Sequence, residues 1–418
     1  MKKTHTNYTG KWTFGLLSCI FLVVVMTCHF PAFAQTATVK DGVVEEFYPN
    51  GILKAKRTYK NGKLQGRTQT YYDSGQTLSI EEYKDNLLHG DYKTYYESGQ
   101  LYFTKEYKNG QQTGTAKEYL EDGTIRSVET FTNDQLNGLG KYYYEDGSLK
   151  YSMNFKDGQL EGISKEYYPN NKLKSEVNYK NNQWDGLISE YDEDGNLEAQ
   201  WNYQDGVRDG PAKIYYPNGQ LKWEANFVND QIEGASLAYS EKGQLLMEAN
   251  FKEGVLMGEV KEYYPNGNLK SAIEYTDDVR DGLAKEFYEN GNIRLERVYQ
   301  TGKEIGESKE YYGNGNVWVE RVYTNASRDG RMKEYYPTGQ LKQEWDITGG
   351  ELEGRSKAYY PNGSLMAEES YLDGKKHGLN KLYYQNGQVA FEDEFVDGAR
   401  IKRNAYDQNG NPDPEESE

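Results

Sequence analysis

Histidine is the side chain that most often binds metals or transfers protons near neutral pH, and this sequence has four, at positions 5, 29, 89 and 377. The first two lie in an N-terminal leader that is described below. His89 and His377 are twelve copies of a 24-residue period apart, which at ~4.8 Å per strand is on the order of 115 Å along a sheet. Unless such a sheet closes on itself, these two side chains cannot share a metal ion or a substrate.

The other groups that perform covalent chemistry are absent or periodic. Both cysteines, Cys19 and Cys28, lie in the leader, so the rest of the chain has no thiolate for catalysis or for zinc. Neither a nucleophile elbow nor a phosphate-binding loop occurs. Carboxylates are abundant, but they recur at fixed positions of the period, which is typical of solvated ion pairs. We therefore expect no enzymatic activity, no catalytic residue, no cofactor and no bound metal.

The segment 407–413 carries oxygen ligands at alternate positions, as calcium-binding loops do. Pro412 stands at the sixth place, where such loops have glycine, and Glu418 ends the chain at the twelfth. This pattern indicates a turn that leads into an acidic tail, rather than a calcium site.

A periodic row of tyrosines is the remaining candidate for binding chemistry. It lies three residues before a recurring turn glycine, and it predicts an aromatic ladder with one ring every ~9.6 Å along one edge of a sheet. Alternation places this ladder on the face opposite the predicted apolar face. The rings either shield the second face of a one-layer sheet or bind an extended glycan or peptide. The ladder comprises Tyr48, Tyr72, Tyr96, Tyr144, Tyr168, Tyr216, Tyr264, Tyr288, Tyr312, Tyr336, Tyr360 and Tyr384.

The strands and turns that position this ladder follow from the 24-residue period of the sequence. A turn glycine recurs every 24 residues from Gly51 to Gly387, with Asn171 as its single replacement, and a shortened sixteenth copy ends at Gly410. A second glycine follows in phase 15 residues later, from Gly66 to Gly378. Self-similarity at this period indicates an array of one small structural unit.

Each unit is predicted to be a β-hairpin. Pro265-Asn266-Gly267 has the residues of a turn that ends in the left-handed conformation, between two short alternating runs. The residue four before the turn glycine is aromatic in all fifteen full copies, and the residue two after it is Leu, Ile or Val in fourteen. A three-residue loop sets these two positions opposite each other. A loop then leads to the next glycine. Parity places the aromatic residue eight after the glycine on the same face as this pair.

The predicted register also sets the residue five before the glycine opposite the residue three after it. Six copies have Glu facing Lys or Arg there: Glu46–Lys54, Glu118–Arg126, Glu166–Lys174, Glu262–Lys270, Glu286–Arg294 and Glu334–Lys342. The lysine six before the glycine, present in eleven of fifteen copies, does not fit this scheme. Alternation points it inward, so we expect it to lie along the aromatic rings with its ammonium group in water.

The fold class predicted is therefore all-β: an elongated, single-layer antiparallel meander of about sixteen hairpins, or about 32 strands. Because neighbouring strands rotate by ~20–25°, the ribbon must coil. We divide the chain into a signal peptide (1–34), an N-terminal cap (35–45), the repeat array (46–403), and a degenerate last repeat with a disordered acidic tail (404–418). The proline- and glutamate-rich tail is expected to protect the last strand edge and to keep the protein monomeric.

The first 34 residues resemble a secretory signal peptide. Basic residues precede an apolar run of 13 residues from Phe14 to Met26, which is shorter than the ~20 residues of a membrane span. Small residues at Ala32 and Ala34 predict cleavage before Gln35, with a lipoprotein signal cut at Cys28 as the weaker alternative. We therefore expect export to the periplasm, the cell surface or the medium.

Charge limits the partners. The leader holds three of the 49 Lys and Arg and none of the 66 Asp and Glu, so the chain that follows carries a net charge of −20. Such a surface repels nucleic acid and anionic membranes, whose binding needs clustered Lys and Arg.

The motif Tyr-Tyr-Pro-Asn-Gly-x-Leu-Lys, followed by Tyr-x-x-Gly and a later Gly, resembles the MORN repeat family and, more closely, its bacterial variant. The resemblance covers residues 46 to about 410. It implies a hairpin array that binds proteins, and many of the similar bacterial proteins are described as antitoxin-like. The function expected is an exported, non-catalytic scaffold for a protein partner. The alternative is a cell-wall or glycan binder that uses the tyrosine ladder.

Overall fold

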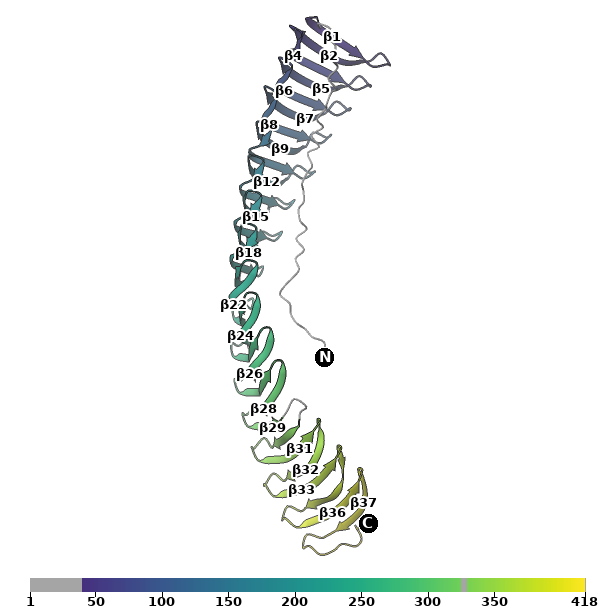
Figure 1. Cartoon of the computed structure of the whole chain (residues 1–418), viewed down its shortest axis with the longest axis vertical. Helices are drawn as coiled ribbons and strands as arrows, with labels where there is room; N and C mark the ends of the chain where they lie inside the picture. Colours follow the sequence, from purple (N-terminus) through teal and green to yellow (C-terminus); the bar gives the residue numbers. More distant parts are fainter. Residues whose placement is uncertain (1–39, 325–328, 418) are drawn as a thin grey trace.

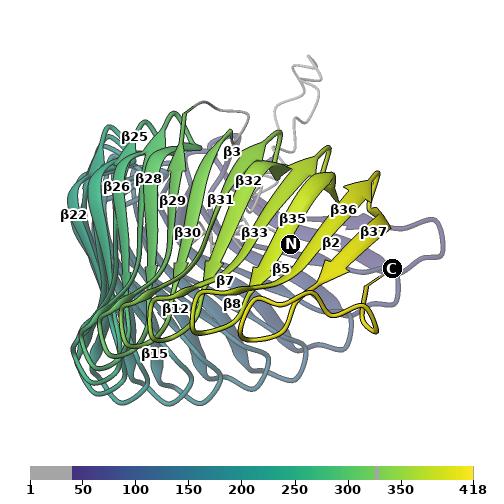
Figure 2. The same ribbon diagram turned by 90° about the horizontal axis from the view of Figure 1, so that it is seen from below.

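A computed structural model describes residues 40–324 and 329–417. The predicted signal peptide, at residues 1–34, lies outside the described residues. The described chain forms one 37-stranded sheet in which successive strands pair antiparallel along the chain. Figure 1 shows the hairpins stacked along one long curved axis, and Figure 2 shows their arms turning progressively about that axis. The all-β, single-layer meander is therefore confirmed, and the sheet is open rather than closed into a barrel.

The strands fall into three groups. The arms that lead into the turn glycine are β1(Gly42–Phe47), β4(Gly66–Tyr71), β6(Leu87–Tyr95), β8(Gln111–Tyr119), β11(Gly138–Tyr143), β14(Gly162–Tyr167), β17(Gly186–Tyr191), β20(Gly210–Tyr215), β22(Gln231–Tyr239), β24(Val255–Tyr263), β26(Val279–Phe287), β28(Lys303–Tyr311), β30(Gly330–Tyr335), β32(Glu351–Tyr359), β35(Gly378–Tyr383) and β37(Ala399–Ala405).

The arms that leave the turn glycine are β2(Leu53–Lys60), β5(Thr77–Lys84), β7(Leu101–Lys108), β9(Ile125–Thr132), β12(Leu149–Lys156), β15(Leu173–Lys180), β18(Leu197–Gln204), β21(Leu221–Val228), β23(Leu245–Lys252), β25(Leu269–Thr276), β27(Ile293–Gln300), β29(Val317–Tyr323), β31(Leu341–Thr348), β33(Leu365–Leu372) and β36(Val389–Val396). The two-residue pieces are β3(Lys63–Leu64), β10(Gln135–Leu136), β13(Gln159–Leu160), β16(Gln183–Trp184), β19(Val207–Arg208) and β34(Lys375–Lys376). The pieces arise where the second glycine interrupts an arm, which is why the strand count exceeds 32.

The first turn of each repeat is the three-residue loop expected from the sequence. In the first copy, the Tyr48 amide donates to the Ile52 carbonyl at 2.8 Å, and Gly51 has a φ of 85°. The Asn50 side chain accepts from the Ile52 amide at 3.0 Å. Asn171, which replaces the glycine once, takes the same left-handed conformation at a φ of 63°. The aromatic and aliphatic positions lie opposite each other, as Phe47 pairs with Leu53.

The register beyond this pair differs from the prediction by one residue. Glu46 pairs with Ala55, not with Lys54, because every repeat has a bulge just after the aliphatic position. The extra residue, Lys54 in the first repeat, reverses the alternation of the whole second arm. The aromatic residue eight after the glycine therefore lies on the face opposite the aromatic–aliphatic pair, and the prediction that they share a face is wrong.

The second connection, expected as a loop, is a two-residue hairpin turn. Asn61 and Gly62 both have positive φ, 52° and 72°, which is the conformation of a type I′ turn. Gly66 follows at a φ of 80°, at the point where the ladder is interrupted. The repeats whose second connection lies within the described residues thus contain two tight turns, one at each edge of the ribbon.

Candidate protein-binding trough

One face of the ribbon forms a trough, which we define by four positions relative to the turn glycine: seven before it, and four, six and eight after it. Nearly all the buried side chains lie at these positions, such as Ala116 and Ala212 at the first and Ala55 and Ala199 at the second. The buried side chains therefore gather on one face of this single-layer sheet.

Small residues form the floor of the trough because larger neighbours close over them. A Cβ atom at Gly140, seven before its turn glycine, would lie 3.0 Å from Cε2 of Phe155 and 3.4 Å from the ring of Tyr142. The aromatic residue eight after the glycine therefore forms one wall. In the centre of the array, Trp201, Trp223 and Phe227 pack with ring centroids 6.3–6.4 Å apart.

The tyrosine ladder forms the opposite wall of this trough, so its predicted place, away from the buried face, is wrong. Lys54 and Lys150, the bulge residues of their repeats, lie over the rings of Tyr48 and Tyr144 at 5.9 and 5.2 Å. Lys150 also lies 5.2 Å from the ring of Tyr151 at the buried position four after the glycine. The bulge that reverses the second arm brings the ladder and the floor to the same side.

Every ladder hydroxyl is bonded to the next repeat. Each one donates to the backbone carbonyl 23 residues on, or 22 for the last, which belongs to the aromatic residue of the following hairpin. The distances are 2.7–3.0 Å for Tyr48, Tyr72, Tyr96, Tyr144, Tyr168, Tyr216, Tyr264, Tyr288, Tyr312, Tyr336, Tyr360 and Tyr384. The ladder therefore joins neighbouring hairpins, whatever else it binds.

The rings of the ladder are half-buried, and several are covered by the bulge residue of their own repeat. Tyr102 contacts Tyr96 at 4.8 Å between ring centroids, and Trp318 contacts Tyr312 at 6.0 Å. Burial raises the pKa of the hydroxyls of Tyr72, Tyr96, Tyr144, Tyr168 and Tyr312. Where a bulge residue lies over a ladder ring, that face of the ring is covered.

All six predicted cross-hairpin ion pairs form, although the register that predicted them was off by one. Nitrogen–oxygen distances are 2.7–3.0 Å in Lys54–Glu46, Arg126–Glu118, Lys174–Glu166, Lys270–Glu262 and Lys342–Glu334, and Arg294 also contacts Glu286. The bulge residue lies on the same side as the glutamate, which explains the contact. Glu190 faces Glu198 instead. Burial raises the pKa of Glu190, and the Trp201 indole donates to it at 3.3 Å.

The position six after the glycine varies along the trough in a way that the repeat fold does not require. It is charged in the first four repeats, uncharged in the next six, and again mostly charged in the last five. The residues in order are Arg57, Glu81, Lys105, Glu129, Met153, Val177, Trp201, Ala225, Ala249, Ile273, Arg297, Arg321, Trp345, Glu369 and Asp393. An apolar centre with charged flanks is the usual composition of a protein-binding surface.

The charged flank is partly desolvated. Burial raises the pKa of the Glu129 carboxyl, which accepts a 2.8 Å hydrogen bond from the Tyr142 hydroxyl. Burial also lowers the pKa of the neighbouring Lys105, whose ammonium lies 4.7 Å from the centre of the Phe103 ring. Because the trough floor is partly shielded from water, a charge on a bound partner would interact more strongly with these side chains than it would in bulk water.

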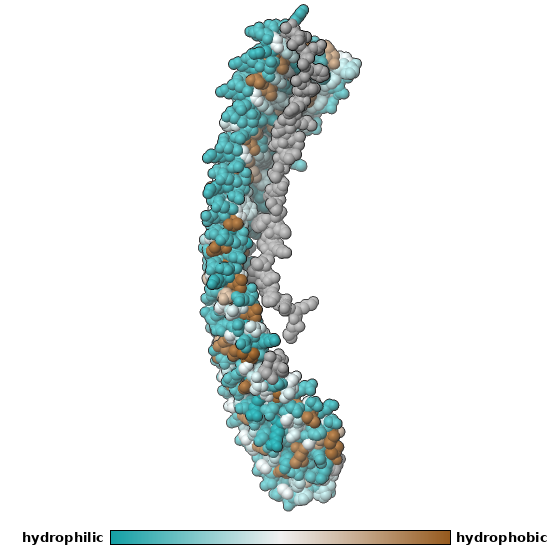
Figure 3. Space-filling model, in the orientation of Figure 1, coloured by the Kyte–Doolittle hydropathy of each residue, from teal (hydrophilic) through white to brown (hydrophobic). Residues whose placement is uncertain are grey.

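The opposite, outer face carries the lysines six before the glycine, which sequence alternation pointed inward. They pair with glutamates five after the glycine, such as Lys285 with Glu296 at 3.1 Å and Lys381 with Glu392 at 2.8 Å. The aromatic residue of the next hairpin joins the network, since Tyr311 donates to Glu296 at 2.6 Å. Figure 3 shows a mostly hydrophilic surface with hydrophobic side chains in small separate groups.

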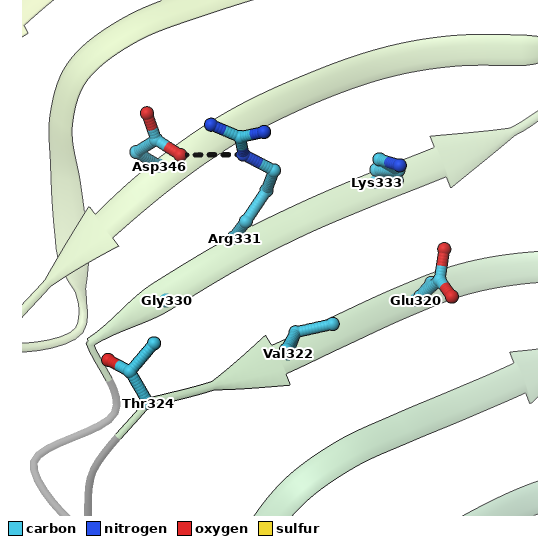
Figure 4. Close-up of a pocket in the computed structure, with 7 residues that line it drawn as sticks. All are labelled: Glu320, Val322, Thr324, Gly330, Arg331, Lys333 and Asp346. Atoms are coloured by element: carbon cyan, nitrogen blue, oxygen red, sulfur yellow. Dashed lines mark hydrogen bonds and ion pairs between the residues drawn. The ribbon is translucent and has the colours of Figure 1, made fainter.

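A depression lies on each of these faces. One, of about 490 Å³, lies on the outer face, where Arg331 bonds Asp346 at 2.9 Å beside Glu320 and Lys333 (Figure 4). Gly330 is required there, because a Cβ would collide with the Val322 carbonyl. The other, of about 270 Å³, lies in the trough and includes Tyr264 of the ladder.

The two histidines lie far apart on an open ribbon. The Nδ1 atom of His89 is 3.2 Å from the Asn109 side chain, whereas that of His377 is 3.9 Å from Asp397. No group of three potential metal ligands occurs within residues 40–324 and 329–417. That part of the chain also has no helix that could cross a membrane. In the segment 407–413, Asp407 accepts the amides of Asn409 and Asn411, as expected for a turn.

Comparison with known families gives fourteen matches to the MORN repeat variant. The matched residues are 40–61, 64–85, 88–109, 112–133, 136–157, 160–181, 184–205, 208–229, 258–277, 280–301, 304–325, 328–346, 352–373 and 376–397. The chain belongs to the MORN repeat variant family. Between two matched copies, the MORN hairpin β22–β23 keeps the same pairing, with Tyr239 opposite Leu245.

The chain is also similar to parts of much larger solved structures. It matches TcdB2-TccC3-Cdc42 at 11% identity and a TM-score of 0.16, covering 88% of this chain and 26% of that one. It matches TcdB2-TccC3 without the hypervariable C-terminal region at 12% identity and a TM-score of 0.15, with the same coverage. The chain thus spans about a quarter of the length of these structures. No curated protein matches the sequence.

Proposed function

We propose that this protein is an exported, non-catalytic and monomeric scaffold that holds an extended segment of a partner protein along its trough. The observation that carries the proposal is the row six after the turn glycine. Its apolar tract runs from Met153 to Ile273 and is flanked by charged residues on both sides. A repeat needs none of this variation in order to pair with its neighbours, so the variation is available for recognition.

The tyrosine ladder supports a protein partner over a glycan. Sugar rings stack on open aromatic faces, but here Lys54 and Lys150 lie over ladder rings and each ladder hydroxyl is bonded to the adjacent hairpin. Nucleic acid and anionic membranes are disfavoured by the net charge of −17 for the whole chain. We place no catalytic or cofactor-binding residue in the trough.

The test compares the two faces of the ribbon. One variant carries Met153→Lys, Val177→Lys and Ile273→Lys in the trough. Its matched control carries Leu139→Lys, Ile163→Lys and Leu187→Lys, three exposed residues of the outer face. Proteins captured from envelope extract are identified and quantified for each, and circular dichroism confirms that both variants keep their β-sheet.

A trough binder should be lost from the first variant and retained by the second. Equal capture by both variants would rule out the trough as the binding face. A glycan array runs in parallel. A reproducible glycan signal that disappears when Tyr264, Tyr288 and Tyr312 are replaced would establish the glycan binder instead.

A further inference from the structure

The two ends of the sheet are not equivalent. At the C-terminal end the tail folds back on β37: the Asp413 amide donates to the Ala405 carbonyl at 2.8 Å, and the Ala405 amide donates to the Ser417 hydroxyl at 2.9 Å. Tyr406 and Pro412 also form a β-bridge. The tail, which we expected to be disordered, thus bonds to β37 at Ala405 and covers the last residue of this edge. Among the described residues, β1 at the other end pairs only with β2.

Alternation identifies the backbone groups of β1 that face away from β2. Thr58, opposite Val43, directs its carbonyl to the Gln65 amide on the far side of β2. Val43 is therefore in a non-hydrogen-bonded pair, and its own amide and carbonyl point outward. The same holds two and four residues further on, at Glu45 and Phe47. The edge thus presents three amide–carbonyl sets to an added strand.

Every interior hairpin fills this position with the second arm of the preceding repeat. Arm β4 pairs with β2 through Gln69 opposite Lys56. At the end of this pairing, the Tyr48 hydroxyl donates a hydrogen bond to the Tyr71 carbonyl. No preceding ladder tyrosine exists among the described residues to reach the Phe47 carbonyl. The β1 edge is therefore built like an interior position that lacks its neighbour.

The side chains on this edge indicate what would fill it. Val43 and Phe47 are 54% and 56% exposed on the outer face, and Glu45 lies between them. Within its own hairpin Glu45 pairs with Lys56 at 3.4 Å. Across the junction between repeats, which corresponds to the open side of β1, several interior pairs join opposite charges, as Glu248 with Lys261 and Glu296 with Lys309. Here the edge residue is the acid, so the added strand should place a base opposite Glu45, between two apolar residues. The acidity of the whole chain favours the same charge.

We propose that the outer edge of β1 is a docking site for an extended, basic β-strand of a partner protein, with alternating apolar, basic and apolar side chains on one face. This site is separate from the trough. The strand would pair antiparallel to β1, through the three outward amide–carbonyl sets, and would extend the sheet by β-augmentation.

The chain itself supplies probes. A labelled peptide with the sequence of residues 53–60, carrying Lys54→Leu and Thr58→Val, reproduces the arm that fills this position for β4. It sets Lys56 opposite Glu45, between two apolar side chains on the same face. A peptide with the sequence of residues 389–396 has the same strand pattern but is acidic. Binding to the chain from Gln35 onward is followed by fluorescence anisotropy, and we expect the first peptide alone to bind.

Three variants separate strand pairing from simple attraction of charges. Glu45→Pro removes one outward amide without removing a bond to β2 and should weaken binding by about fivefold or more. Glu45→Lys keeps the amide but repels the peptide, and should weaken binding at least as much. Glu394→Lys makes the same charge change on the same face near the other end, and should leave binding unchanged.

Each contrary result overturns the proposal. Absence of binding by the basic peptide, or equal loss in Glu45→Lys and Glu394→Lys, would exclude a specific basic-strand site. If Glu45→Pro disturbs the first hairpin in circular dichroism, Glu45→Lys decides alone. A concentration-dependent dimer that Glu45→Pro abolishes would show that the edge accepts a second copy of this chain instead. Since the trough variants leave β1 intact, loss of trough binding leaves this experiment unaffected.

Discussion

Removal of a single ladder hydroxyl should loosen one junction between hairpins. In Tyr264→Phe the ring stays in the trough wall, but the 2.8 Å hydrogen bond to the Phe287 carbonyl is lost. That carbonyl belongs to the following hairpin, so the bond spans the junction between two repeats. A hydrogen bond of this kind contributes about 1 kcal/mol net, and an acceptor left unpaired would raise the cost toward about 2 kcal/mol.

The neighbouring residue provides a matched control. Tyr263 lies on the outer face, and its hydroxyl donates to Glu248 over 3.4 Å. Tyr263→Phe removes the same atom from the adjacent position, but it breaks a longer and therefore weaker bond, so its effect should be a few tenths of a kcal/mol at most. The opposite change is also available. Leu120 occupies a ladder position, and Leu120→Tyr should add a bond to the Tyr143 carbonyl and stabilise that junction by about 1 kcal/mol.

The assay must be local, because long repeat arrays do not unfold in a single two-state step. Amide hydrogen exchange, read by mass spectrometry in segments of about one repeat, should accelerate about fivefold in Tyr264→Phe across β24 to β27. Distant repeats should not change. Exchange that is unchanged in Tyr264→Phe, or equally changed in Tyr263→Phe, would falsify the view that ladder hydroxyls join the hairpins.

Four further outcomes are expected. Deletion of residues 258–281, one whole repeat, should leave a folded and shorter ribbon by circular dichroism and size-exclusion chromatography. Deletion of any 12 consecutive residues within it should cause aggregation, because it breaks the alternation of the two turns. Asn171→Gly should raise thermal stability slightly or leave it unchanged; Gly267→Val should lower it by about 1–2 kcal/mol, because a φ of 87° is unfavourable for a β-branched residue even though an added Cβ meets no atom within 4 Å. Hydrogen bonding to Tyr311 lowers the pKa of Glu296 below 4.5, so its contribution to stability is present above that pH and is lost as the pH falls through the folded pKa; Glu296→Gln should flatten the acid limb of a urea-denaturation series, and an unchanged limb would count against this contribution. Truncation after Arg403 should expose the last strand and promote end-to-end association, whereas a truncated protein that stays monomeric in light scattering would show that the tail does not protect the edge.

The parts of the fold that sequence predicted are those set by local chemistry. A glycine or asparagine that must adopt positive φ marks the turn, as Gly51 and Asn171 do, and a three-residue loop fixes the pair Phe47–Leu53 that follows it. The second turn was equally legible. Asn61-Gly62 is among the strongest hairpin signals, and it marks a tight turn where we expected a loop.

The assignment of faces failed because one extra residue reverses every side chain after it. No residue type is obligatory at the bulge, where Lys54, Leu78 and Trp318 all occur. The sequence did contain a signal of the reversed face. The lysines six before the glycine would be charged side chains inside an apolar core, which is unfavourable. The residues five after the glycine, which include Glu176, Glu296 and Glu392, are the partners that would have placed those lysines outside.

The role of the ladder could not be predicted from a single repeat. A tyrosine hydroxyl that reaches a carbonyl 23 residues away, as Tyr72 reaches Tyr95, depends on how one hairpin is stacked on the next. Composition shows only that the ring is amphipathic. The trough itself was missed for the same reason, because its floor of alanines and serines is recognisable only once the bulge is placed.

The ladder bonds also have a direction. Each tyrosine hydroxyl, from Tyr48 to Tyr384, donates to a carbonyl in the hairpin that follows it in the chain. A polypeptide that emerges N-terminus first from a ribosome or a translocation channel therefore presents each donor before its acceptor exists. Every new hairpin completes the one already formed, and no contact has to wait for distant sequence. Contacts this local favour rapid folding. The ribbon can therefore fold from its N-terminal end, one hairpin at a time, as the chain emerges.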